Sequence, residues 1–256
     1  MLIPCSSRPF SSRCLTAGLA AALAIGLLGG VPGASARDDT PAASPDPVQR
    51  FLAHPDEKLT QYRAKRHLQA RNERFNKEAW LDALTELDPG KGFRYTILAE
   101  DGSGLIRNRV LHRALDAEQQ ALAEGEVGRS AISPANYQIS FGAHDETSGL
   151  DKLRIVPLRK EQMLVDGTIS VLATDGELVR IEGRLAKTPS FWTNRVDIVR
   201  RYGRIEGVHV PLSIESTANL KIVGDSVFSM TYEYESVNGK AVSKPAGTVS
   251  QPLTKP

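Results

Sequence analysis

Residues 212–236 read LSIESTANLKIVGDSVFSMTYEYES, and this stretch decides the class of fold. From Ile214 to Ile222, apolar or small residues alternate with polar ones, and the same alternation returns with larger side chains from Phe228 to Tyr234. A period of two is typical of a β-strand that buries one face. Because Gly224-Asp225 between the two runs favours a tight turn, the stretch predicts an antiparallel hairpin.

The segments before this hairpin continue the β pattern. TISVLAT (168–174) and ELVRIEG (177–183) are short runs rich in β-branched residues. The dipeptides Asp166-Gly167 and Asp175-Gly176 flank them and are typical of hairpin turns. From Tyr137 onward the sequence therefore predicts a β-meander.

Three more antiparallel strands are predicted between Leu59 and Ala99. Residues 60–70 alternate, and Asp88 to Gly92 has tight-turn chemistry before the strand-like FRYTILAE. The segment 78–87 also carries Trp80, Leu84 and Leu87 at helical spacing, so a helix is the alternative there. We favour a strand, because a helix would run directly into the proline turn.

Two helices complete the pattern. Residues 105–124 carry apolar side chains at helical spacing, and Gly125 and Gly128 favour its end. Val48 to Leu52 predicts a short helix that stops before Pro55. Many strands and few helices predict a β-rich α+β fold, in which helices cover the concave face of a curved antiparallel sheet, or half-barrel.

The first residues have the features of a secretory signal peptide. Arg8 and Arg13 precede an uncharged run from Leu15 to Leu28, and Ala34-Ser35-Ala36 supplies small residues for cleavage before Arg37. The run is shorter than the ~20 residues of a membrane span. We therefore expect an exported protein, most plainly a periplasmic one, that does not span a membrane after cleavage between Ala36 and Arg37.

Removing this segment changes the composition of the chain. Its two cysteines, Cys5 and Cys14, lie within it, so the remaining chain has no disulfide and no cysteine metal site. Arg8 and Arg13 account for the net charge of +2, so a neutral protein remains, with no electrostatic reason to bind nucleic acid. The predicted organisation is a signal peptide (1–36), a flexible leader (37–47), a single domain (48–238) and a polar tail (239–256).

The sequence contains no strong catalytic or cofactor motif. The five histidines lack the spacing of a helical zinc site, and there is no G-x-S-x-G elbow, phosphate loop or dinucleotide fingerprint. His144 beside Asp145 and Glu146 could form a weak metal site, although a solvated loop is the better interpretation. Gly224-Asp225-Ser226 is similar to the box of some secreted esterases, but it sits in a predicted hairpin. We predict no catalytic residue, no metal ligand and no cofactor.

The segment 180–201 is the most distinctive part of the chain. Pro189-Ser190-Phe191-Trp192 places two large aromatic side chains between arginine-rich strands. They could form a ligand mouth or a docking surface, or they could plug one end of the sheet. We favour the plug, because large aromatic side chains usually supply core area.

Several of these segments together resemble a known family. The hairpins VDGTISV (165–171) and DGELVRIEG (175–183), the run EGRLAKTPSFW (182–192) and the run VRRYGRIEGVHVPLSIES (199–216) resemble exported bacterial proteins of the LolA-like superfamily. That superfamily contains periplasmic lipoprotein carriers and outer-membrane lipoprotein-sorting proteins. The resemblance covers about residues 48–237 and implies a half-closed barrel, lidded by helices, whose apolar cavity accepts lipid or acyl chains.

We therefore expect a non-enzymatic exported protein that binds a lipid or a lipoprotein acyl chain in a cavity between sheet and helices. An envelope protein could be a further partner. Two alternatives stay open: an envelope interaction or stress-sensing module without lipid cargo, and a secreted hydrolase. The candidate ligand-binding residues are the large apolar side chains Trp80, Leu84, Leu111, Leu115, Phe191, Trp192, Phe228, Met230 and Tyr232.

Overall fold

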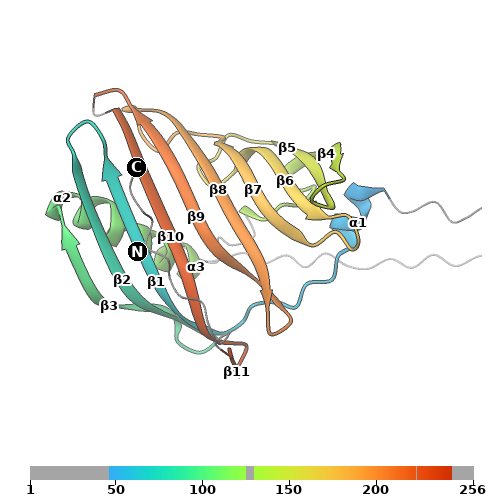
Figure 1. Ribbon diagram of the computed structural model, residues 1–256, viewed down its shortest axis with the longest axis horizontal. Coiled ribbons are helices and arrows are strands. Elements are labelled where there is room, and N and C mark those ends of the chain that lie inside the picture. The colour runs from blue at the N-terminus through green and yellow to red at the C-terminus, as the bar shows by residue number, and fades with distance from the viewer. Residues whose placement is uncertain (1–45, 125–129, 223, 244–256) are drawn as a thin grey trace, which may run out of the picture. The chain divides into compact units, whose positions relative to one another are not determined.

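The strands form one sheet in which every neighbouring pair is antiparallel (Figure 1). The computed structural model describes residues 46–124, 130–222 and 224–243. The predicted signal peptide, almost all of the leader and most of the polar tail lie outside these residues. The described strands are β1 (Tyr62–Asn72), β2 (Lys77–Asp88), β3 (Gly92–Gly102), β4 (Tyr137–Asp145), β5 (Leu150–Pro157), β6 (Val165–Leu172), β7 (Leu178–Leu185), β8 (Thr193–Ile205), β9 (Val208–Leu220), β10 (Gly224–Val237) and β11 (Lys240–Ala241).

The strand order is β3-β2-β1-β10-β9-β8-β7-β6-β5-β4, and β11 pairs with the end of β10. The sheet is open, because β3 and β4 form its two edges. The N-terminal strand β1 lies beside the C-terminal strand β10, where Leu68 faces Met230. The hairpin predicted from residues 212–236 is confirmed as β9 and β10, with Ile214 opposite Met230.

The first three strands are also confirmed, including the strand at 78–87. Within β2 the alternate residues Ala79, Leu81 and Ala83 are buried, which is a strand period and not a helical one. In β1 the buried positions alternate in the same way. These positions of both strands face the helices, so the hairpin contributes one continuous apolar surface.

A continuous helical segment lies across one face of β1, β2 and β3 (Figure 1). It consists of α2 (Gly104–Ile106), a π-helical turn η1 (Arg107–Leu111) and α3 (His112–Ala123). Ile106, Leu111 and Leu115 are buried against the sheet. The predicted long helix is therefore present, and the expectation of helices over a curved antiparallel sheet is confirmed.

The short helix α1 (Pro47–Ala53) packs on the strands at the β4 side of the sheet. Its Arg50 guanidinium lies 3.2 Å from an Oδ2 atom of Asp151, whose side chain is almost fully buried. Gly176 sits directly beneath α1. A Cβ atom at this position, where φ is +84°, would lie 2.7 Å from the backbone of Arg50, so only glycine admits the helix.

One predicted turn is wrong. Asp166-Gly167 lies inside β6, and Gly167 pairs with Gly183 of β7. A Cβ atom on Gly167 would meet the carbonyl oxygen of Glu182 at 2.0 Å and the Cα atom of Gly183 at 2.6 Å. The two strands approach closely there because neither residue has a side chain, and such glycine pairs allow a sheet to bend.

The buried side chains form separate clusters along the sheet. One cluster lies under α1 and includes Leu153, Ile169 and Val196. A second lies under the helical segment and includes Leu68 and Leu111. A third closes the opposite end of the first strands. The first two clusters meet near β8, β9 and β10, and the cavity described next lies at their boundary.

Candidate ligand cavity

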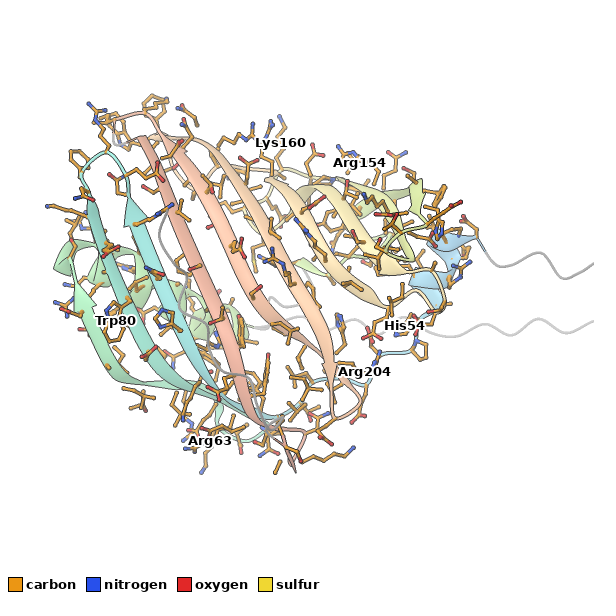
Figure 2. The ribbon with its side chains drawn as sticks, viewed as in Figure 1. His54, Arg63, Trp80, Arg154, Lys160 and Arg204 are labelled. Carbon is orange, nitrogen blue, oxygen red and sulfur yellow. The ribbon has the colours of Figure 1, made fainter. Side chains whose placement is uncertain are left out.

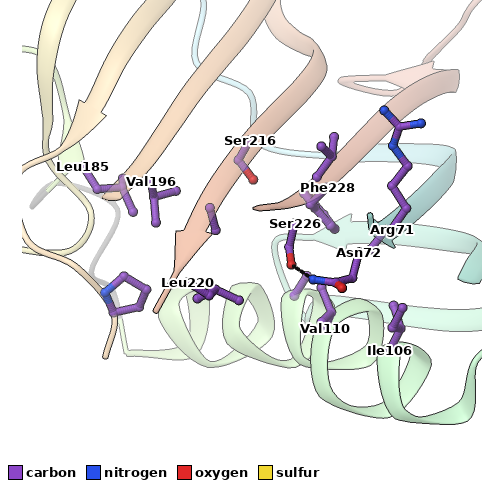
Figure 3. Close-up of a pocket in the computed structure, with 15 residues that line it drawn as sticks. Arg71, Asn72, Ile106, Val110, Leu185, Val196, Ser216, Leu220, Ser226 and Phe228 are labelled. Carbon is purple, nitrogen blue, oxygen red and sulfur yellow. Dashed lines mark hydrogen bonds between the residues drawn. The ribbon is translucent and has the colours of Figure 1, made fainter. Parts of the chain in front are cut away.

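A cavity of about 350 Å³ opens between the helical segment and the sheet (Figure 3). Ile106, Val110 and Ala114 form its helical wall. The sheet wall comes from β1, β7, β8, β9 and β10, whose strands end or begin at this place. The sheet side and the loop after β7 contribute Ala70, Arg71, Asn72, Leu185, Pro189, Val196, Ser216, Ala218, Leu220, Ser226, Val227 and Phe228.

The π-helical turn sets the helical wall. A π turn places one extra residue in the helix and shifts the face that follows it. Ile106, just before the turn, and Val110 inside it both line the cavity, while Leu111, the last residue of the turn, is fully buried in the packed cluster. Two neighbouring residues of the turn therefore face different surroundings: Val110 faces the cavity, and Leu111 faces the packed core.

Few polar side chains line the cavity. The Nδ2 atom of Asn72 donates a hydrogen bond of 2.8 Å to the Oγ atom of Ser226 (Figure 3). Most other lining groups are aliphatic or aromatic. Among the described lining residues there are two serines but no histidine, aspartate or glutamate. An apolar interior with a few polar groups at the edge is the usual build of a site for an apolar ligand.

Some of the sequence-predicted site residues gather near this cavity. Phe228 lines it directly. Leu111, Leu115 and Met230 lie beside it in the packed cluster, where each is at most 7 % exposed. Tyr232 packs at the edge of the same cluster. The structure thus brings five of the nine predicted residues to one side of the sheet.

Trp80 and Leu84 are not among them. In β2 the residues that face the helices are Ala79, Leu81 and Ala83, so Trp80 and Leu84 point to the opposite face of the sheet. There the Trp80 ring stacks on His67, with the ring centroids 6.1 Å apart (Figure 2). Their helical spacing suggested one shared apolar face, but the strand period places them outside the cavity.

Phe191 and Trp192 do not plug the sheet. Their exposed fractions are 78 % and 57 %, so the expectation that they supply core area is wrong. The two rings meet edge to face, 5.6 Å apart, and the Nζ atom of Lys221 lies 3.8 Å from the centroid of the Phe191 ring. They stand beside the cavity, since Pro189 of the same loop lines it.

A buried arginine connects the helical segment to the sheet. Arg66 of β1 is only 2 % exposed, and its guanidinium donates hydrogen bonds of 2.5 and 2.9 Å to the carboxylate of Glu118 on α3. A further bond of 2.5 Å reaches the hydroxyl of Tyr62. The Tyr232 ring lies beneath the guanidinium, 4.5 Å away. We call Arg66 and Glu118 the helix latch.

Arg66 is charged despite its burial. Burial lowers the pKa of Arg66, but the hydrogen bonds and charge of Glu118 outweigh this effect, so its pKa lies above the usual value. No role is predicted for Arg66 from the sequence. The alternation that made Ala64 and Leu68 core positions also placed Arg66 in the core, and this was the available signal.

The tyrosines around the latch predict a pH dependence. Burial raises the pKa of Tyr62 to about 12, and burial also raises the pKa values of Tyr232 and Tyr234. A tyrosine with a raised pKa in the folded state ionises first in the unfolded chain, near its ordinary value of ~10. Stability is therefore complete below pH ~10 and falls as the pH rises toward 12, by about 1 kcal/mol per pH unit for each such tyrosine.

Urea unfolding followed by circular dichroism between pH 8 and 12 measures this slope. Tyr62→Phe removes one ionising group, so we expect a shallower fall in its free energy of unfolding above pH ~10 than in the unchanged chain. Equal slopes for the two proteins would contradict the assignment to Tyr62.

Other residues of the cavity were not predicted. Ile106, Ala114, Leu185, Val196 and Ala218 are ordinary apolar positions of their strands and helix. Their spacing in the sequence does not distinguish a residue that lines a cavity from a residue packed in the core.

The described residues contain no candidate metal cluster and no helix that could span a membrane. Nowhere in them do three or more His, Cys, Asp or Glu side chains gather in a way that could hold a metal ion. His144, considered as a metal ligand, lies in β4 and its Nδ1 atom is 2.7 Å from Asp151. Within the same residues, no helix has the length and apolar character needed to cross a bilayer.

The strand order and the helical segment define an open antiparallel sheet with helices across one face. The chain is similar to the crystal structure of a LolA superfamily protein from Nitrosomonas europaea, with a TM-score of 0.34 and 7 % sequence identity over 73 % of this chain and 90 % of that chain. No family model and no curated protein matches the chain.

Proposed function

We propose that this protein is an exported, non-enzymatic protein that binds a lipid or a lipoprotein acyl chain in the cavity between the helical segment and the sheet. The observation that carries the proposal is the cavity itself, apolar on both walls and open at one end of the sheet. Its volume of about 350 Å³ lies at the lower end of the ~300–1,000 Å³ typical of small-molecule sites. This suits one acyl chain better than a whole phospholipid.

Burial of the ligand's acyl chain would supply the binding free energy. Each methylene group moved from water into the cavity contributes about 0.8 kcal/mol. Ala114 and Ala218, on the two walls, leave the space that the ligand fills. No charged partner for a carboxylate is needed inside, because a polar head would remain at the edge beside Asn72 and Arg71.

Release requires the helical wall to move. The latch fixes the helical segment to the sheet, and Tyr95 donates a 2.6 Å hydrogen bond to Asp116 and Gln119 one of 3.2 Å to the carbonyl of Phe93. The carboxylate of Glu100 on β3 adds a further tie, since Arg107 of η1 donates a 2.9 Å hydrogen bond to it and the Nε2 atom of His112 lies 2.5 Å from it. The latch, Asp116 and Gln119 lie on α3, whereas Arg107 lies on η1, next to the cavity. Displacement of α2 and η1 would break the Arg107–Glu100 ion pair and widen the cavity, while the rest of α3 stays anchored.

Substitutions that fill the cavity from either wall test the proposal. Ala114→Phe and Ala218→Phe each place a ring in the space, and we expect each to lower the affinity for cis-parinaric acid, a fluorescent fatty acid, by at least about tenfold, since an acyl chain would lose several methylene contacts. The control is Ala99→Phe on the exposed edge of β3. Unchanged affinity in both cavity variants, with their folding confirmed by circular dichroism, would contradict the proposal.

The export of the protein and the alternative function, an envelope interaction module, have separate tests. Mass spectrometry of the chain recovered from a periplasmic fraction is expected to show an N-terminus at Arg37. Native mass spectrometry of the same material is expected to show bound lipid. A ligand-free mass that co-purifies with another envelope protein would favour the interaction module, and no nucleic acid is expected in either preparation.

A further inference from the structure

The loops at the open end of the cavity carry an unusual concentration of exposed apolar side chains. We define the mouth end as the end of the sheet where β1, β7 and β9 finish and β2, β8 and β10 begin (Figure 1). Seven large apolar side chains in the described residues are more than half exposed, and only Leu98 lies elsewhere. The six at the mouth end form what we call the apolar rim: Phe75, Leu105, Leu158, Phe191, Trp192 and Ile222.

Hydrogen bonds join the loops that carry the rim. The amide of Lys221 donates a 2.9 Å hydrogen bond to the carbonyl of Trp192. The Arg74 guanidinium donates one of 2.5 Å to the carbonyl of Ile222, so the turns after β1 and β9 touch. The side chain of Gln162 reaches the carbonyl of Pro189. The loops that carry five of the six rim residues, all except Leu105, are therefore joined into one surface.

The same loops are basic. Residues 73–76, 158–164, 186–192 and 221–222 contain five cations and two anions, although the chain beyond the predicted signal is neutral. The cations are Arg74, Arg159, Lys160, Lys187 and Lys221. Lys160 lies at this end of the molecule in Figure 2. The excess positive charge thus coincides with the exposed apolar side chains.

We infer that the mouth end docks on an anionic phospholipid surface, with Phe191 and Trp192 inserted at the level of the head groups. Aromatic tips beside lysines fit the boundary between water and acyl chains, because the ring enters while the ammonium group stays at the phosphates. Lysine is depleted in the cores of protein–protein interfaces, so this composition favours a membrane over a protein partner. The inference deepens the proposed function, since it gives the surface from which a lipid would reach the cavity.

The two tryptophans provide a direct test. They are Trp80, on the outer face of β2, and Trp192, at the rim. In the Trp80→Phe variant the tryptophan fluorescence comes only from Trp192 at the rim. In the Trp192→Phe variant it comes only from Trp80, which lies away from the rim. Both are made in the chain from Arg37 to Pro256, which contains the whole compact unit Ser44–Pro256. The probe is a vesicle of phosphatidylethanolamine and phosphatidylglycerol.

We expect the emission of Trp192 to shift to shorter wavelength with these vesicles and to be quenched by lipids brominated near the head group, while the emission of Trp80 is unaffected.

Lys187→Gln with Lys221→Gln should lower partitioning onto the vesicles by about fivefold for each cation removed, with a smaller loss at high salt. The control pair is Lys91→Gln with Lys240→Gln, at the opposite end of the sheet. Phe191→Ser should lower partitioning by about tenfold, and its control is Leu98→Ser.

A Trp192 emission that does not respond to vesicles would overturn the inference, as would equal losses in the rim variants and their controls. Binding to an envelope protein without binding to vesicles would also overturn it. Uptake of cis-parinaric acid in the absence of vesicles is measured on the same variants. Normal uptake of the fatty acid by a protein that does not dock on vesicles contradicts this inference and leaves the proposed function intact. Docking on vesicles without uptake of the fatty acid contradicts the proposed function and leaves the docking surface intact.

Discussion

Replacing Glu118 with alanine is expected to lower the free energy of unfolding by about 3 kcal/mol, because the change leaves a buried guanidinium without its counter-charge. Arg66 is 2 % exposed and cannot reach water without moving α3, whereas Glu118 itself is about one-third exposed. The cost therefore arises from Arg66 and not from the loss of the carboxylate's own contacts. We also expect faster exchange of a bound fatty acid, since the helical wall loses its strongest tie to the sheet.

The reverse change should be much less harmful. Arg66→Met keeps an unbranched side chain among the rings of Tyr62 and Tyr232, and it leaves behind only a carboxylate that solvent reaches. Replacing a buried ion pair by apolar groups is often neutral or stabilising. Arg66→Met combined with Glu118→Ala should thus be more stable than Glu118→Ala alone.

Urea unfolding of the two single variants and the double variant measures this asymmetry as a double-mutant cycle. Equal destabilisation by both single changes, with simple additivity in the double variant, would show that the latch contributes nothing as a pair.

Gly167→Ala is the second change with a large expected effect. Its Cβ atom would lie 2.0 Å from the carbonyl oxygen of Glu182, a backbone atom that cannot rotate away. We expect a loss of about 3 kcal/mol in the free energy of unfolding, since β6 and β7 must separate to admit a methyl group.

The matched control is Gly90→Ala in the turn after β2. A Cβ atom there would meet only the Oδ1 atom of Asp88, at an ordinary distance of 3.5 Å. Its effect should lie within about 0.5 kcal/mol. If thermal unfolding shows the same stability for both variants, the close approach of the two strands is not a constraint on the sequence.

The parts of the fold that could be predicted are those where one face of an element is buried. In β10 the alternation from Phe228 to Tyr234 defined both the strand and the face turned to the helices. In the helical segment the helical spacing identified Leu111 of η1 and Leu115 of α3 as the packed side. Such patterns record burial residue by residue, so they can be recognised without any knowledge of the neighbouring elements.

Features that depend on a partner strand could not be predicted in this way. Asp166-Gly167 has the chemistry of a turn, but its conformation is set by Gly183, which pairs with it across the sheet. The burial of Arg66 as an ion pair could not be predicted, because its partner Glu118 lies on a helix about fifty positions further along the chain. The cavity is the extreme case, since its walls come from segments between Ala70 and Phe228.

The boundary between the two packed clusters has a consequence for energetics. Leu185, Val196 and Ala218 belong to one cluster, and Ala70, Ile106 and Phe228 belong to the other, yet all of them border the cavity. An apolar ligand seated there would contact both clusters at once. Because a ligand that binds only the folded protein stabilises it, such a ligand would raise the free energy of unfolding of both parts together.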